Sequence, residues 1–221
     1  MSTPSPEIRF RRSTRARRVS LRIDPFSSSV IVTLPPRATQ AAGRALLRAH
    51  AGWVAARLAR LSAALLLEDG AFVPITGVPH VIRHCPGGQT RIVEQELLVS
   101  GALEFLPRRV MDFLRAEAGR RLSEQALAIA SASGLTPRRV AMRDTRSRWG
   151  SCTAGGTLMF CWRLIMAPPA VQHYVVAHEV AHLRHMNHSA AFWALVAQLT
   201  PHRAEADAWL DRHGAGLMRV A

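Results

Sequence analysis

Residues 174–193 read YVVAHEVAHLRHMNHSAAFW, and the organisation of the chain follows from this stretch. Within it, His178, Glu179 and His182 form an H-E-x-x-H pattern. Residues four apart lie on one face of an α-helix, about one turn from each other, so both imidazoles can bind a single ion. The positions just before the motif are apolar or aromatic, namely Val171, Tyr174, Val175 and Val176. The pattern therefore predicts a buried helix that carries a metal site.

Glu179 follows the first histidine directly and lies beside the face that both histidines share. From there its carboxylate can reach a water molecule on the metal rather than the metal itself. A carboxylate in that place can take a proton from the water and pass it later to a leaving amine. The pattern thus predicts hydrolysis, with Zn²⁺ as the cofactor and Glu179 as the general base.

Three residues compete to be the third protein ligand, because a catalytic zinc has three and keeps a fourth position for water. His188 follows His182 by six positions, so the chain would have to leave the helix and bend back. His185 would stay on the same face if the helix continued, and Glu205 would come from a later helix. We favour His188, because Ser189 can cap the next helix and hold its neighbour in place.

The segment RSRWGSC, residues 146–152, admits two interpretations. In the first it forms part of the substrate cleft with Trp149, and Arg146 or Arg148 binds a substrate carboxylate or the oxyanion. In the second it is a tight turn, with Trp149 as a packed plug before a strand that begins at residue 157. The sequence alone leaves both open.

The segments before this region are rich in strand patterns. Alternation over 17–24 and 29–34, around Pro25 to Ser28, is typical of a β-hairpin. Thr39 is a candidate N-cap for a helix over 40–66. Short strands then follow at 71–75, 78–84, 90–94 and 96–100.

The remaining chain is mostly helical, with a long helix predicted over 103–132 and strands over 138–144 and 157–164. Three further helices are expected from Pro168-Pro169 to about 184, over 189–199 and over 202–212. We interpret the chain as an α+β fold. Residues 1–102 would form a β-rich N-terminal region with one helix, and residues 103–221 the catalytic half.

The net charge is +14, from 29 basic residues, all of them arginine, against 15 acidic ones. Such a field attracts nucleic acid or acidic partners, although a solvated basic surface is the simpler interpretation. The arginines at 9–22 and 108–121 distinguish these two interpretations. If they form one face, a nucleic-acid partner is favoured over a merely solvated surface. No apolar run is long enough to predict a membrane span, and no signal peptide is evident, so we expect a cytoplasmic protein.

The stretches RWGSC (148–152) and CWRLIMAPPAVQHYVVAHEVAHLRHMNHSAAFW (161–193) resemble the YgjP-like metallopeptidases, relatives of the SprT-like and WLM zinc peptidases. The resemblance is strongest over about residues 143–213 and extends more weakly to RRSTRARRVSLRID near the N-terminus.

This resemblance implies a zincin-like catalytic half and a zinc-dependent peptidase acting on peptides or proteins. It implies that His178, His182 and His188 are the zinc ligands and that Glu179 is the base. Some of these relatives act on DNA-bound proteins. The alternative is therefore a basic nucleic-acid-associated protein whose metal site is structural or vestigial.

Overall fold

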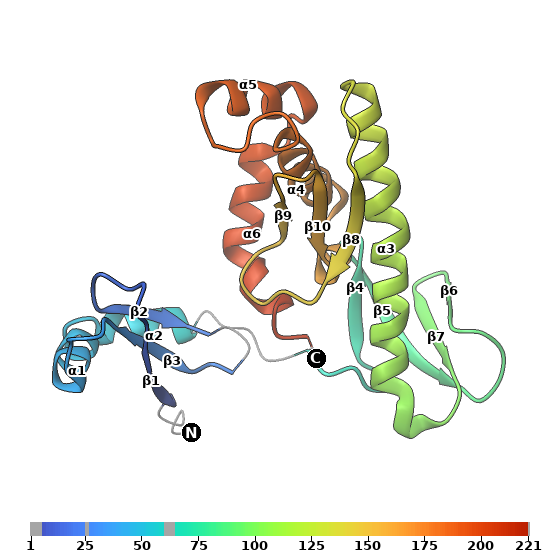
Figure 1. The fold of residues 1–221 in the computed structure, drawn as a ribbon. Coiled ribbons are helices and arrows are strands. Elements are labelled where there is room, and N and C mark those ends of the chain that lie inside the picture. Colours follow the sequence, from blue (N-terminus) through green and yellow to red (C-terminus); the bar gives the residue numbers. More distant parts are fainter. Residues whose placement is uncertain (1–5, 25–26, 60–64, 221) are drawn as a thin grey trace. The chain divides into compact units, whose positions relative to one another are not determined.

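The computed structural model describes residues 6–24, 27–59 and 65–220. The chain divides into two compact units, Met1–Ala64 and Leu65–Ala221 (Figure 1). The predicted division between residues 102 and 103 instead falls inside the second unit. The reason is a shared core, because Ile82 and Leu97 of the strand region lie in the same hydrophobic cluster as Leu114 of the long helix.

The first unit contains a three-stranded sheet with the order β1-β3-β2. Strand β1 (Ile8–Arg12) pairs in parallel with β3 (Val30–Leu34), and β2 (Ser20–Ile23) pairs with β3 in antiparallel fashion. The predicted hairpin is confirmed in its two strands, whereas Pro25 and Phe26 of its turn lie outside the described residues. Strand β1 was not predicted.

Two helices follow the sheet in the first unit. Helix α1 (Gln40–Ala49) begins at the predicted cap, where the Thr39 hydroxyl accepts a hydrogen bond from the Ala42 amide at 3.2 Å. The prediction of one helix over 40–66 is wrong, because α1 ends at His50 and a separate helix α2 covers Ala51–Ala59. Residues 60–64 of that prediction lie outside the described residues.

The second unit begins with a four-stranded sheet whose order is β4-β5-β7-β6. All four strands lie within one or two residues of their predicted positions: β4 (Phe72–Ile75), β5 (Val78–Cys85), β6 (Arg91–Val93) and β7 (Glu96–Ser100). Strands β5 and β7 are parallel, and the other two pairings are antiparallel.

Helix α3 (Leu106–Ala132) connects this sheet with the rest of the unit, after a short 3-10 helix η1 (Leu103–Phe105). Its buried residues recur at every fourth position, which places them on one face. They are Leu106, Val110, Leu114, Ala118, Leu122, Ala126 and Ala130. The helix contacts strands of both sheets, β7 and β8, which explains why residues 65–100 do not form a domain of their own.

A second sheet of this unit lies beside α3 in Figure 1 and has the order β8-β10-β9. Strand β10 (Thr157–Cys161) pairs in parallel with β8 (Arg139–Arg143) and in antiparallel fashion with β9 (Gly150–Cys152). Strand β9 is therefore an edge strand, and it was not predicted. Residues Trp162–Met166, expected in part to extend the strand, form the 3-10 helix η2.

Three helices complete the second unit: α4 (Pro169–Ala181), α5 (Ala190–Leu199) and α6 (Arg203–Leu217). Helix α4 is the central one, because it contacts α3, α5, α6 and β9. Within the part of the chain that is described, no helix combines the length and the apolar character needed to cross a membrane.

Arg163 of η2 links Val220 to Asp144, which lies in the segment before β9. Its guanidinium is buried and donates to the Val220 carbonyl through Nε at 3.1 Å and Nη2 at 2.8 Å, and to the Asp144 carboxylate through Nη1. Partial burial acts to raise the pKa of Asp144, but the hydrogen bond and charge of Arg163, together with smaller contributions from Trp162 and Arg115, outweigh it and leave that pKa below its usual value. Asp144, which precedes β9, is thus tied to both η2 and α3.

Candidate metal centre

Three histidines from two neighbouring segments converge on one point. His178 lies in the last turn of α4, His182 is the residue that ends this helix, and His188 lies in the loop before α5. Their ligand nitrogens all lie within 4.8 Å of one another, and the Nε2 atoms of His178 and His188 are 3.2 Å apart. The helix ends before the predicted residue 184, which allows the chain to turn back and bring His188 to the other two.

The protonation state of these rings fits a metal site. Burial, and after it the neighbouring rings of His182 and His188, lower the pKa of His178 to about 4. Burial also lowers the pKa of His182. Both rings are therefore neutral at pH 7, and a neutral imidazole is the form whose lone pair binds a metal ion.

The ring of His182 is oriented from both sides. Its Nδ1 lies 2.9 Å from the backbone carbonyl oxygen of His185. A carbonyl can only accept, so Nδ1 carries the proton and Nε2 is left for a metal. The same ring stacks on Phe192, with the ring centroids 4.5 Å apart.

Helix α5 fixes the third histidine from the other side. The Ser189 hydroxyl accepts a hydrogen bond from the Phe192 amide at 3.4 Å, as the predicted cap requires. Phe192 and Trp193 then contact the ring of His188, at centroid distances of 4.8 and 5.6 Å. His188 itself is exposed while His182 is buried, so the centre is open to solvent on the His188 side.

The two alternative ligands lie elsewhere. The convergent group found among the described residues contains neither His185 nor Glu205. His185 contributes its backbone carbonyl to His182, and Glu205 lies in the first turn of α6 with 72% of its side chain exposed, 3.9 Å from His202. This arrangement supports His188 over both.

Glu179 lies in α4, between the two motif histidines in the sequence. The residue is only 6% exposed. Its side chain packs directly on the backbone of β9, since a Cβ on Gly150 would lie 2.5 Å from Cγ and 2.6 Å from Oε1 of Glu179. Burial raises the pKa of Glu179 to about 7, against the lowering effect of the Arg148 charge. Gly150 was not expected to matter, because the contact joins residues far apart in the sequence.

The segment RSRWGSC divides into two kinds of residue. Arg146 and Arg148 are exposed, and the Arg148 carbonyl accepts a hydrogen bond from the Thr145 hydroxyl at 2.7 Å. The charge of Arg148 acts to lower the pKa of Glu179. Trp149 instead packs on α6, where a Cβ at Gly214 would lie 3.2 Å from its ring.

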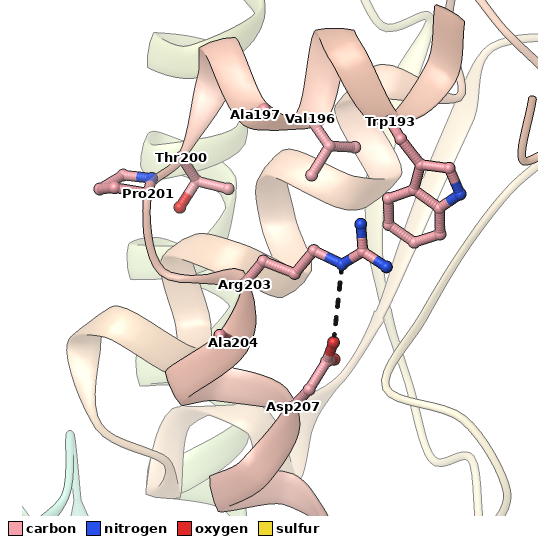
Figure 2. A pocket seen from close by; sticks show the side chains of 8 residues that line it. All are labelled: Trp193, Val196, Ala197, Thr200, Pro201, Arg203, Ala204 and Asp207. Carbon is pink, nitrogen blue, oxygen red and sulfur yellow. Dashed lines mark ion pairs between the residues drawn. The ribbon is translucent and has the colours of Figure 1, made fainter. Parts of the chain in front are cut away.

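A pocket of about 470 Å³ lies between α5 and α6 and shares a wall with the metal centre (Figure 2). That wall is Trp193, whose ring centroid is 5.7 Å from that of His178. The Arg203 guanidinium lies 3.6 Å from the Trp193 ring centroid, and Nε pairs with Asp207 at 3.8 Å. The pocket thus offers a positive charge beside an aromatic surface, a feature that the sequence did not suggest.

Comparisons with known proteins identify a metallopeptidase family. Residues 17–213 match the family model of the YgjP-like metallopeptidase domain. A search of curated proteins finds no match. A crystal structure of the metallopeptidase zymogen of Pyrococcus abyssi abylysin shares 18% identity, with a TM-score of 0.38, over 41% of this chain and 93% of that one.

Proposed function

Because the chain belongs to the YgjP-like metallopeptidase family, we propose that it is a zinc-dependent peptidase in which His178, His182 and His188 hold the ion. The observation that carries the proposal is the convergence of the three ligand nitrogens within 4.8 Å. Three protein ligands would leave one position of a tetrahedral zinc for water or substrate. We place this zincin-like catalytic half at residues 103–221, within the second unit.

The proposed chemistry is hydrolysis of a peptide bond. A zinc ion held there would polarise the scissile carbonyl and lower the pKa of a water molecule. Glu179 takes a proton from the attacking water and later donates it to the leaving amine. Burial acts to raise the pKa of Glu179, which makes its carboxylate a stronger base toward that water.

The loop before β9 is the proposed substrate contact. Arg148 is the better supported arginine, because its charge acts on Glu179. Arg146 is exposed in the same loop and is our second candidate for a substrate carboxylate. The packing of Trp149 on α6 supports the interpretation of this residue as a plug that holds the loop in place.

Gly150→Ala tests the proposed function through the position of the base. The added Cβ would lie within 2.5–2.8 Å of three atoms of Glu179, so the carboxylate must move. A misplacement of about 1 Å costs on the order of 10²-fold in rate. We expect a loss of that size in kcat for peptide hydrolysis, with one zinc ion still bound per chain. The rate is measured on the purified chain with a quenched fluorescent peptide mixture.

Gly155→Ala is the matched control, because its Cβ would meet nothing closer than the Thr153 hydroxyl at 3.9 Å. This variant should keep its activity. Unchanged hydrolysis by Gly150→Ala would contradict the catalytic position of Glu179. Loss of zinc together with activity would show that the substitution acts through the histidines instead.

A further inference from the structure

The smaller of the two units carries the larger net charge. The first, residues 1–64, contains 12 of the 29 arginines but only two of the 15 acidic residues, Glu7 and Asp24, a net charge of +10. The second has more than twice the length and a net charge of +4. A codon bias would explain why every basic residue is arginine and none is lysine. Such a bias leaves the net charge unchanged and acts on both units alike. The asymmetry therefore needs another explanation.

Several arginines of the second unit pair with neighbouring carboxylates. On α3, Arg115 pairs with Asp112 and Asp144, and Arg120 and Arg121 both pair with Glu117. The expected contribution of the 108–121 arginines to a basic face is thus reduced. In the first unit Glu7 pairs with Arg9 at 2.8 Å, and two carboxylates cannot neutralise 12 guanidinium groups.

The sheet of the first unit has one face covered by a helix and one face that carries arginine. Helix α1 packs on the first face, since a Cβ at its Gly43 would lie 2.9 Å from side-chain atoms of Phe10 and Val32. Successive side chains of a strand alternate between faces. Arg9 and Arg11 of β1 therefore lie on the opposite face.

The strand register extends this face across the sheet. Arg9 and Arg22 are both partners of Ile31 on the central strand, from β1 and β2 respectively, so the two arginines flank it. The connection from β1 to β2 adds further exposed arginines. We use the name arginine face for Arg9, Arg11 and Arg22 of the strands together with Arg15, Arg17 and Arg18 of the adjoining connection, all of them exposed.

The neutral side chains on this face favour a polyanion over a lipid surface. Those of the central strand, Ile31 and Thr33, are half-buried. Anchoring in a membrane surface is strengthened by exposed apolar side chains that insert beside the basic ones, and the strand positions of this face offer none. The aromatic ring of β1, Phe10, faces α1, so it provides no platform on which bases could stack.

We propose that the arginine face binds the phosphate backbone of a nucleic acid. Guanidinium groups donate paired hydrogen bonds to phosphate oxygens, and each phosphate contact releases counterions, which gives affinity without reading the bases. The face therefore binds DNA and RNA strands alike, with little sequence preference. The inference concerns the first unit and does not depend on the peptidase activity of the second.

The test compares two triple variants of the full chain that lose the same charge. One, Arg11→Gln/Arg18→Gln/Arg22→Gln, removes three members of the arginine face. The control, Arg83→Gln/Arg108→Gln/Arg120→Gln, removes three exposed arginines of the second unit. Binding is measured by fluorescence anisotropy with labelled 20-nucleotide dT and U strands between roughly 50 and 200 mM salt.

For the wild type we expect micromolar affinity at low salt and a steep decline with salt. The face variant should lose at least about tenfold in affinity, and the slope of log K against log salt should decrease by about 2, because each phosphate contact on a single strand contributes roughly 0.7. The control should bind like the wild type. Both variants should keep the zinc content and the peptidase activity of the wild type.

Four results would overturn the proposal. The first is negligible binding of the wild type to both strands, and the second is an equal loss in both variants, which would indicate overall charge rather than a face. The third is a preference of more than about tenfold for dT or for U, because a backbone contact does not discriminate them. The fourth is tighter binding to polyglutamate or to anionic phosphatidylserine vesicles, which would assign the face to an acidic protein or to a membrane.

Discussion

Glu179→Gln should remove nearly all peptide hydrolysis and leave the zinc in place. Glutamine has almost the same shape as glutamate, so it fits the buried site against Gly150, but its amide cannot take the proton of the attacking water. Loss of a general base costs about 10²–10⁴-fold in kcat. The measurement pairs hydrolysis of a fluorescent peptide mixture with elemental analysis of zinc per chain.

The matched control is Glu205→Gln, which removes an exposed carboxylate of α6. It should retain both activity and zinc. Full activity of Glu179→Gln on a peptide that the wild type cleaves would contradict the assignment of the base. Loss of zinc from Glu179→Gln would make this residue a ligand rather than a base.

His188→Ala should lower zinc affinity by more than about tenfold, since even residues that only support metal ligands affect affinity by 10–100-fold. His185→Ala should change affinity little. The contact of His185 with the centre is its backbone carbonyl on His182, which alanine keeps. A competition titration with a chromophoric chelator compares the two variants with the wild type.

The two variants also separate the alternative ligands. If His185→Ala lost zinc and His188→Ala kept it, the third ligand would be His185. If both kept wild-type affinity, Glu205 would become the candidate despite its exposed position in α6. Either result would contradict the convergence of three imidazoles as the metal site.

Local signals explain what the sequence predicted well. The four-residue spacing of His178 and His182 depends only on helix geometry. Likewise, the choice of His188 depended on a cap at Ser189, whose hydroxyl does accept from the Phe192 amide. Such features involve residues close in sequence, so one stretch of twenty residues was enough to predict them.

Features that depend on distant partners were missed. Strand β9 has three residues, too few for an alternating pattern, and exists because it pairs with β10. Strand β1 reads IRFRR, which looks like part of a basic segment until β3 pairs with it in parallel. The contact of Gly150 with Glu179 has the same origin, because it joins an edge strand to a helix.

The helix that covers the strands of residues 71–100 could not be identified from the sequence for a related reason. The strand patterns over residues 71–100 were correct, but a pattern does not tell which element covers the apolar face. Helix α3 does so, with Leu114 in the same core as Ile82 and Leu97. The first hundred residues therefore belong to two units rather than one.

Anomalous diffraction at the zinc absorption edge would locate the ion directly, on crystals of protein purified without chelators. We expect one strong peak at about 2.0–2.1 Å from one imidazole nitrogen each of His178, His182 and His188, with no fourth protein ligand. A peak with four protein ligands would make the site structural. No peak at these histidines, in protein that hydrolyses peptides, would contradict the account.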